Sequence, residues 1–89
     1  MGKATITVYG ALRDKLGWKQ KTIEFHGDNT KLKDLVSKVP ELKFIVKGDK
    51  LVEGFIILIN GIHAQFRGGI NAIIKDGDEI SIFPPGAGG

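Results

Sequence analysis

The chain ends in Gly88-Gly89, which places a free carboxylate on a backbone without side chains. Glycine has no Cβ, so a Gly-Gly end can adopt backbone angles closed to other residues and can enter a channel too narrow for side chains. Such an end suits delivery of its own carboxylate to the active site of another enzyme. The alternative is an ordinary frayed terminus, since chain ends are commonly poorly ordered.

The residues before the terminus favour a positioned carboxylate. Residues 76–79, Asp-Gly-Asp-Glu, are typical of a tight turn, and alternating apolar residues predict a strand that ends at Phe83. Pro84 and Pro85 follow without a linker and favour an extended path. Residues 84–89 could therefore project the carboxylate on the order of 20 Å from the body. We predict a folded domain over residues 1–83 and a flexible tail over residues 84–89.

The rest of the chain offers little chemistry of its own. It contains no cysteine, which excludes disulfides, thiolate metal sites and a thioester or persulfide on a side chain. A carboxylate is a poor electrophile, and the chain has no Gly-Lys-[Ser/Thr] phosphate loop. Activation must therefore come from a partner that supplies ATP and a metal ion. We expect no cofactor and no metal ion to be bound by this chain itself.

Several polar residues are weaker candidates for a site. Asp76, Asp78 and Glu79 lack the spacing of a calcium loop and are expected to shape the turn and face water. His63 and His26 have no evident carboxylate or cysteine partner, so we expect them in packing or surface roles. The pair at residues 68–69, Gly-Gly, lacks a following helix and predicts a turn rather than a phosphate site.

Charge and hydropathy narrow the function classes further. The formal net charge is +3, but the basic residues are spread from Lys3 to Lys75, so we expect no nucleic-acid partner. The lysines are expected to form a solvated surface, with modification acceptors as the alternative role. The longest apolar run, residues 55–59, is far short of a membrane span, and no charged-then-apolar leader opens the chain. We expect a soluble, cytoplasmic protein without a membrane partner.

Periodicity predicts the elements of the first half. Residues 4–9 and 20–25 alternate apolar with small or polar residues, which indicates two strands that pair as a hairpin. The connection between them, residues 10–18, is long, and we expect Leu12 and Leu16 to tuck under the sheet. A helix is predicted from an N-cap at Thr30 to just before Pro40. Its apolar stripe consists of Leu32, Leu35, Val36 and Val39.

The second half is predicted to complete the sheet. Residues 41–51 show no clear pattern and are expected to be irregular with a short helix. The apolar run over residues 55–60, closed by Asn-Gly, predicts a strand covered on both sides and a turn. A short returning strand follows at residues 62–64, then a loop and the last strand. The economical arrangement is an α+β fold in which one main helix packs on a mixed sheet of four to five strands.

This order resembles the ubiquitin-like β-grasp fold, and the chain resembles the small sulfur carriers of the MoaD/ThiS type over nearly its whole length. The resemblance rests on the opening strand with residues 11–13, the strand and turn of residues 52–61, and the block from Asp76 to Gly89. That block joins Asp-Gly-Asp-Glu, a short strand, Phe-Pro-Pro and a terminal Gly-Gly. The molybdopterin synthase small subunit is the closest branch, because Phe-Pro-Pro before the last four residues is typical of it.

The resemblance implies a sulfur-transfer cycle. An E1-like enzyme would adenylate the Gly89 carboxylate with ATP, and a sulfur donor would convert the acyl-adenylate to a thiocarboxylate. Gly88 would supply the slim backbone that the partner's channel requires. The tail would then enter the large subunit of molybdopterin synthase and release sulfur to a pterin precursor. The chain would be substrate and carrier, with the catalytic side chains belonging to its partners.

Partner docking is expected on an apolar patch of the exposed sheet face near the root of the tail. By the family pattern, the candidates are Tyr9, His63 and Phe83, followed by Pro84 and Pro85. Tyr9 and Phe83 could instead be ordinary core residues, since aromatic residues in strands are usually buried. Exposed aromatic residues beside the tail would favour docking.

Two other function classes remain open. The same activated terminus could be attacked by a lysine amine of a target protein, as in ubiquitin-like and archaeal small modifiers, or could supply sulfur for tRNA thiolation. A binding domain with an incidental Gly-Gly end is the third class, and it predicts that deleting the tail has no consequence.

Overall fold

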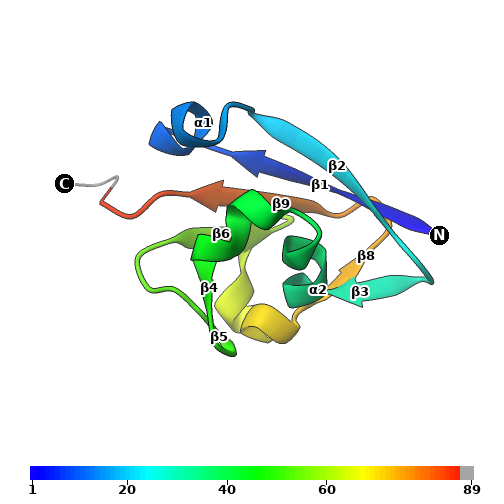
Figure 1. Ribbon diagram of the computed structural model, residues 1–89. Helices are drawn as coiled ribbons and strands as arrows, with labels where there is room; N and C mark the ends of the chain where they lie inside the picture. Colours follow the sequence, from blue (N-terminus) through cyan, green and yellow to red (C-terminus); the bar gives the residue numbers. More distant parts are fainter. Residues whose placement is uncertain (87–89) are drawn as a thin grey trace.

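Alternation of side chains gives the first strand, β1 (Gly2–Val8), one buried and one outward face. Ala4, Ile6 and Val8 are buried, whereas Thr5 and Thr7 are partly exposed. The computed structural model, which describes residues 1–86, places β1 beside the central strand of a five-stranded sheet (Figure 1). No helix among these residues is long and apolar enough to span a bilayer.

The sheet is mixed, as predicted. Its order is β2 (Gln20–Phe25), β1, β9 (Glu79–Phe83), β6 (Ile56–Ile59) and β7 (Ile62–His63). β1 and β9 run parallel, and every other pair of neighbours is antiparallel. The predicted hairpin of β1 and β2 is confirmed. The parallel pair brings the two ends of the chain into neighbouring strands, so the last strand is anchored in the middle of the sheet.

The main helix, α2 (Leu32–Ser37), lies under one face of the sheet (Figure 1). The predicted apolar stripe, Leu32, Leu35, Val36 and Val39, is buried in the core with the inward residues of β1, β6 and β9. Burying such side chains stabilises the fold by about 1.5–3 kcal/mol each. The α+β, ubiquitin-like β-grasp prediction of one main helix on a mixed sheet is confirmed.

The predicted N-cap at Thr30 is wrong. Asn29–Lys31 form a short strand, β3, which pairs antiparallel with β8 (Ile73–Lys75). No side chain caps α2; instead the Leu32 N–H donates to the Ala72 carbonyl at 2.9 Å. A contact distant in sequence thus satisfies one of the free donors at the helix start, and local sequence rules do not foresee such contacts.

The connection between β1 and β2 contains a short helix, α1 (Ala11–Leu16), that the sequence did not predict. Gly17 ends it in the left-handed conformation and donates its N–H to the Arg13 carbonyl at 2.9 Å. Leu12 is buried and Leu16 packs against the core, as expected.

Residues 40–51 fold into short elements. The expected short helix is a 3₁₀ helix, η1 (Pro40–Ile45). A small hairpin of β4 (Val46–Lys47) and β5 (Lys50–Leu51) follows it, where the sequence indicated irregular structure. Two-residue strands carry too few residues for a recognisable alternation.

The expectation that the strand after residue 55 is covered on both sides is wrong. Ile57 and Ile59 of β6 are buried, but Ile56 is 40% exposed and Leu58 is half-buried. The loop predicted after β7 folds as two 3₁₀ helices, η2 (Ala64–Arg67) and η3 (Gly69–Asn71). The helix covers only one face of the sheet, so the apolar run of β6 leaves part of its other face open.

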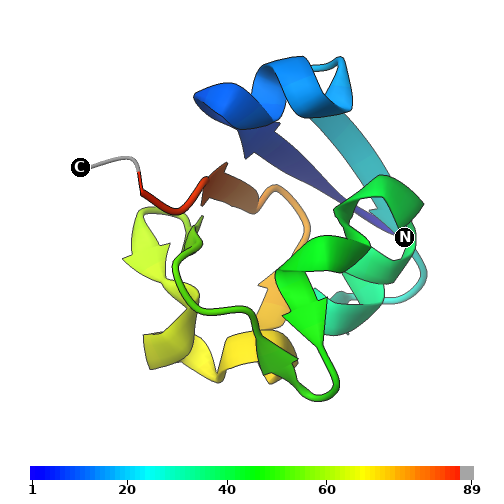
Figure 2. The same cartoon turned by 60° about the vertical axis from the view of Figure 1, so that its left-hand side comes forward.

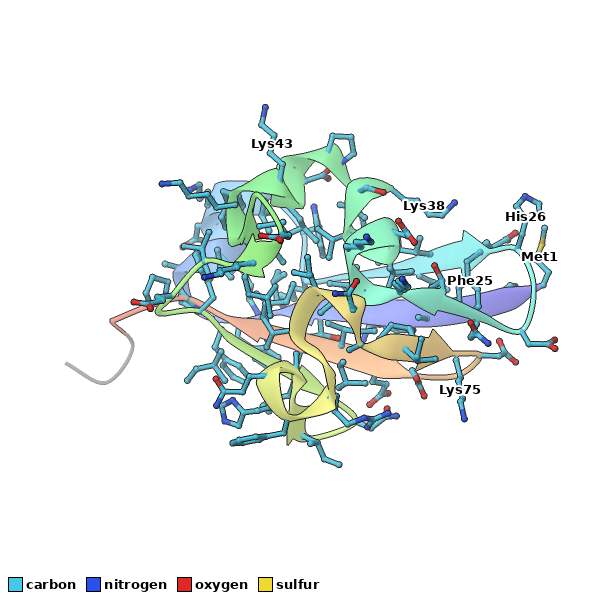
Figure 3. The ribbon with its side chains drawn as sticks, turned by 90° about the horizontal axis from the view of Figure 1, so that it is seen from below. Met1, Phe25, His26, Lys38, Lys43 and Lys75 are labelled. Carbon is cyan, nitrogen blue, oxygen red and sulfur yellow. The ribbon has the colours of Figure 1, made fainter. Side chains whose placement is uncertain are left out.

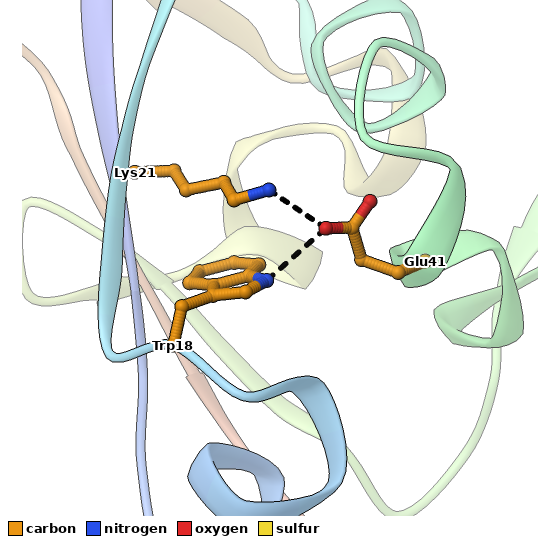
Figure 4. Close-up of polar contacts among 3 residues, drawn as sticks. All are labelled: Trp18, Lys21 and Glu41. Carbon is orange, nitrogen blue, oxygen red and sulfur yellow. Dashed lines mark hydrogen bonds and ion pairs between the residues drawn. The ribbon is translucent and has the colours of Figure 1, made fainter.

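Trp18, which the sequence left unplaced, lies just before β2 and links the connection between α1 and β2 to η1 (Figure 4). Its Nε1 donates to Glu41 Oε2 at 3.1 Å, and the Lys21 ammonium donates to the same oxygen at 2.7 Å. The Lys21 Nζ also lies 5.0 Å from the centroid of the Trp18 ring. The Lys21 hydrogen bond, more than any other cause, holds the pKa of the Glu41 carboxyl below its ordinary value.

The lysines point to different sides of the molecule. Figure 3 shows Lys38 and Lys43 on the side of α2 and η1, with Lys75 on the opposite side. Among residues 1–86, the structure shows one ion pair, between Lys21 and Glu41. The three labelled lysines therefore do not share one side of the molecule.

Candidate functional site

The root of the tail leaves the sheet at the end of β9. Phe83 and Pro84 are half-buried, whereas Pro85 and Gly86 are exposed. Gly88 and Gly89, the predicted reacting end, lie outside the described residues. The site that can be described is therefore the surface from which the tail departs.

Tyr9 and Phe83 form an aromatic stack at this root. Their ring centroids are 4.4 Å apart and their planes differ by 9°. The parallel pairing of β1 and β9 brings them together, and the Tyr9 N–H donates to the Ile82 carbonyl at 3.0 Å. Both side chains are half-buried, so they are neither core residues nor free surface residues. The stack gives the tail a rigid apolar base.

Arg13 of α1 completes this base. Its guanidinium carbon lies 5.3 Å from the centroid of the Tyr9 ring, and its Nε donates to the Val8 carbonyl at 3.0 Å. The hydrogen bond fixes the cation beside the stack. A positive charge thus lies close to the root of a tail that ends in a carboxylate.

An apolar patch extends from the stack across the outer face of the sheet. Ile56 lies opposite Phe83, and Leu58 lies opposite both Ser81 and His63. These outward side chains alternate with the buried Ile57 and Ile59. We name as the outer patch the residues that share this face and end of the sheet, together with the neighbouring aromatic residue of η2: Tyr9, Ile56, Leu58, His63, Phe66 and Phe83.

The outer face is polar away from the tail. Thr5 and Thr7 of β1 point outward next to Thr22 and Gln20 of β2, and Gln20 donates to the Thr7 hydroxyl at 3.1 Å. Glu79 continues this polar region on β9. Only the end of the face beside the tail root is therefore apolar, which is the arrangement expected of a docking surface.

His63 is an exposed member of the patch. Its ring meets the Phe66 ring edge-on, with centroids 5.9 Å apart, and Phe66 is 74% exposed. Among the described residues, the His63 side chain forms no hydrogen bond with a carboxylate, so its contacts are those of a surface aromatic residue. His26 lies beside Met1 at the opposite end of the sheet, remote from the tail root (Figure 3).

The acidic turn before β9 is structural. Asp76 accepts from the Lys3 N–H at 2.9 Å, and Asp78 accepts from the Lys75 N–H at 2.7 Å. Asn60 donates to Asp78 at 2.8 Å and accepts from the Glu79 N–H at 2.9 Å. The two Asn60 bonds tie the turn between β6 and β7 to the turn before β9. The acidic residues therefore shape the turn, as the sequence predicts.

A groove of about 440 Å³ adjoins the patch. It lies between the segment from Asp49 to Phe55 and the 3₁₀ helices η2 and η3, and His63 and Gly54 are among its lining residues. The groove therefore borders both the outer patch and the segment that flanks the tail.

Sequence reasoning missed several residues of this region. Ile56 and Leu58 were assigned to a strand covered on both sides, although the alternation of any strand would have placed them on one face. Arg13 gave no indication of a functional role beyond its place in residues 11–13, which carry part of the family resemblance. Gly54 also gave none, because its role depends on a segment that lies about thirty residues further along the chain.

Comparison with known proteins supports a family assignment. The family model described as "ThiS family" matches residues 6–89, which is nearly the whole chain. No curated protein matches the chain in sequence.

Solved structures show the same fold. Small archaeal modifier protein 1 from Methanosarcina acetivorans is 31% identical, with a TM-score of 0.74 over 100% of this chain and 98% of that one. SAMP1 from Haloferax volcanii is 28% identical, with a TM-score of 0.76 over 99% and 100%. A chain of the BexX/CysO complex of Amycolatopsis orientalis is also 28% identical, with a TM-score of 0.75 over 97% and 99%. With its β-grasp sheet and the match of the family model, this chain belongs to the ThiS family of ubiquitin-like sulfur carriers.

Proposed function

We propose that the chain carries sulfur as a thiocarboxylate on Gly89, with Gly88 supplying the slim backbone that enters partner active sites. The observation that carries this proposal is the position of the outer patch at the root of a tail that ends in Gly-Gly. A carrier of this kind needs a surface that a partner can bind and a terminus that the bound partner can reach.

In the proposed cycle, an E1-like enzyme adenylates the chain. The Gly89 carboxylate attacks the α-phosphate of ATP, and pyrophosphate leaves. Hydrosulfide from a sulfur donor then attacks the carbonyl carbon, a C–S bond forms, and AMP leaves with the former carboxylate oxygen, which yields the thiocarboxylate. ATP and its metal ion are bound by the partner, because this chain offers no phosphate loop for them. The chain's own residues bind the partner and orient the tail.

Docking is proposed to use the outer patch. Tyr9 and Phe83 present a rigid half-buried stack, and His63 extends the surface toward the exposed Phe66. Pro84 and Pro85 continue from this surface into the tail, so a partner that covers the patch also meets the start of the tail. The similarity to a chain of the BexX/CysO complex supports association with a partner protein.

For the sulfur acceptor, we propose a pterin precursor bound by a molybdopterin synthase large subunit. The Phe83-Pro84-Pro85 segment before the last four residues supports this branch, since it is typical of the small subunit of that enzyme. The chain would act as a subunit without catalytic side chains of its own, and its plain carboxylate would be reloaded after each transfer.

The test is the intact mass of the full chain after incubation with its host's E1-like enzyme, ATP and a sulfur donor. We expect a gain that matches exchange of one oxygen for sulfur at Gly89, and no gain in a chain that lacks Gly88 and Gly89. Subsequent loss of that gain on adding the large subunit and pterin precursor would support the pterin branch. An unchanged mass under all conditions would contradict the carrier proposal.

A second candidate is conjugation to lysines of target proteins. The similarity to two small archaeal modifier proteins favours it, one of them at 31% identity over 100% of this chain. The adenylate is the same, but an amine attacks in place of sulfur and forms an isopeptide bond. High-molecular-weight adducts in host extract that require Gly88 and Gly89 would support conjugation, and their absence would leave sulfur transfer as the only fate.

A further inference from the structure

The start of the tail lies between two glycines that are distant in sequence. Gly10 precedes α1, and Gly54 lies in the turn between β5 and β6. Figures 1 and 2 show these two segments on either side of the end of β9. A Cβ placed on Gly10 would lie 3.4 Å from Pro84 Cγ, and one placed on Gly54 would lie 2.8 Å from Pro85 Cβ. The lack of a side chain at Gly54 therefore makes room for Pro85, whereas a Cβ at Gly10 would make an ordinary contact with the Pro84 ring.

We infer that Gly54 and Gly10 form a clamp that sets the direction in which the tail leaves the sheet. This inference rests on the proposed function, since it names the residues that position the reacting terminus. Gly54 is the more informative of the two. Pro85 Cβ is a ring atom bonded directly to the backbone, so a side chain at residue 54 cannot be accommodated by rotation of a flexible group.

The clamp moves the last contact between the described part of the tail and the body from Phe83 to Pro85. If the chain pivoted at Phe83, residues 84–89 would reach about 20 Å at full extension, whereas residues 86–89 reach at most about 14 Å beyond Pro85. A shorter tether confines its end to a smaller volume and raises its effective concentration in the partner's active site, by about twofold for this difference in length. The direction of departure adds to this effect, because a misplacement of about 1 Å can cost a hundredfold in rate.

The experiment compares Gly54→Ala with Gly27→Ala in the full chain. Both glycines have positive φ, +96° and +80°, so alanine strains the backbone in each. A Cβ at residue 27 meets nothing within 4 Å, whereas one at residue 54 meets Pro85. Gly10 is unsuitable because its φ of +59° and ψ of −138° belong to the residue that starts α1.

We measure kcat and KM for thiocarboxylation by the E1-like partner, with this chain as the varied substrate. Gly54→Ala is expected to lower kcat between about twofold and a hundredfold relative to Gly27→Ala, with KM unchanged because the outer patch is intact. A kcat equal to that of Gly27→Ala within measurement error overturns the inference. Pro85→Gly removes the contact from the other side, so Gly54→Ala is expected to have a smaller effect in that background.

A second measurement does not depend on the proposed function. In the unmodified full chain, a nuclear Overhauser contact is expected between the Gly54 Hα and the Pro85 ring protons, and its absence overturns the clamp. If this contact is present but the wild-type chain gains no sulfur, the carrier proposal fails while the clamp stands. The two failures are therefore distinguishable.

Discussion

At the scale of single residues, the proposed function is divided between a terminus and a surface. The proposed reacting group is a backbone carboxylate, and the side chains near the root of the tail are mostly aromatic or aliphatic, with Arg13 beside them. Tyr9 and Phe83 stack at 4.4 Å, and the prolines that follow pack on Gly10 and Gly54. In the proposed function these residues bind the partner and position the tail, and the catalytic groups belong to the partner.

Replacing Gly88 tests the terminus directly. Gly88→Val is expected to abolish thiocarboxylation, because a β-branched side chain restricts the backbone and widens the tail. The free energy of unfolding is expected to change by less than about 0.5 kcal/mol, since the last buried core residue among those described is Ile82. Intact mass spectrometry gives the first result and thermal unfolding the second. A variant thiolated at the normal rate would show that tail width is irrelevant.

Phe66→Ala tests the outer patch. Phe66 is 74% exposed, so its removal is expected to change stability by less than about 0.5 kcal/mol. Removal of an aromatic contact residue is expected to weaken partner binding by about 1 kcal/mol or more. Titration calorimetry with the E1-like partner measures the loss. Ile73→Ala is the matched control, because Ile73 is 40% exposed and lies outside the patch; equal losses in both variants would place docking elsewhere.

At the scale of elements, short segments are held by contacts between them rather than by their own sequence. η1 is tied to β2 through Glu41, which accepts from both Trp18 and Lys21. The first N–H of α2, that of Leu32, donates to the Ala72 carbonyl. Asn60, in the turn after β6, donates to Asp78 in the turn before β9. Helices of this length are marginal in isolation, so their stability comes from packing.

Glu41→Gln is expected to lower the unfolding temperature at neutral pH. The folded-state pKa of Glu41 is lowered from its ordinary 4.5, mainly by Lys21, so its stabilising effect is present above pH 4.5 and is lost as the pH falls through the folded-state pKa. The difference between wild type and variant should therefore shrink as the pH falls below 4.5. High salt should also reduce it, because the ion pair is exposed.

Thermal unfolding between neutral and acidic pH measures the effect of Glu41. Glu24→Gln is the control, because Glu24 lies on the same strand as Lys21 and forms no ion pair among the described residues. If both variants show the same dependence on pH, the contact between β2 and η1 makes no specific contribution.

At the scale of the whole molecule, the parallel pair of β1 and β9 organises the fold. It places the first and last strands side by side, so the tail leaves from the central strand of the sheet, which has a paired neighbour on each side. The helix covers one face and leaves the other open. In the proposed function, a partner binds this open face without disturbing the core.

Ile6→Ala tests how much the buried face of β1, next to the central strand β9, contributes to stability. Ile6 is fully buried on β1 opposite Ile80, and its truncation is expected to cost about 2–5 kcal/mol of unfolding free energy. Thr7→Ala, on the outward face of the same strand, is expected to cost far less. Chemical denaturation measures both. Similar costs for the two variants would mean that β1 does not have one buried and one outward face.

The sequence by itself predicted a reactive C-terminal carboxylate and most of the helices and strands. The Gly-Gly end, the absence of cysteine, the alternation in β1, β2 and β9, and the stripe of Leu32, Leu35, Val36 and Val39 are all local patterns. Local periodicity shows which side chains share a face, so the main helix and the mixed sheet were predicted correctly.

Only the tertiary structure decided which segments meet. Tyr9 stacks on Phe83, and the Leu32 N–H at the start of α2 donates to the Ala72 carbonyl. Pro85 packs against Gly54. The N-cap at Thr30 and the strand covered on both sides were wrong for the same reason. Pairing and coverage depend on residues far away in the chain, and periodicity contains no information about a segment's partner. The proposed chemistry of the terminus therefore follows from the local sequence. The surface at the root of the tail depends on the pairing of distant segments in the fold.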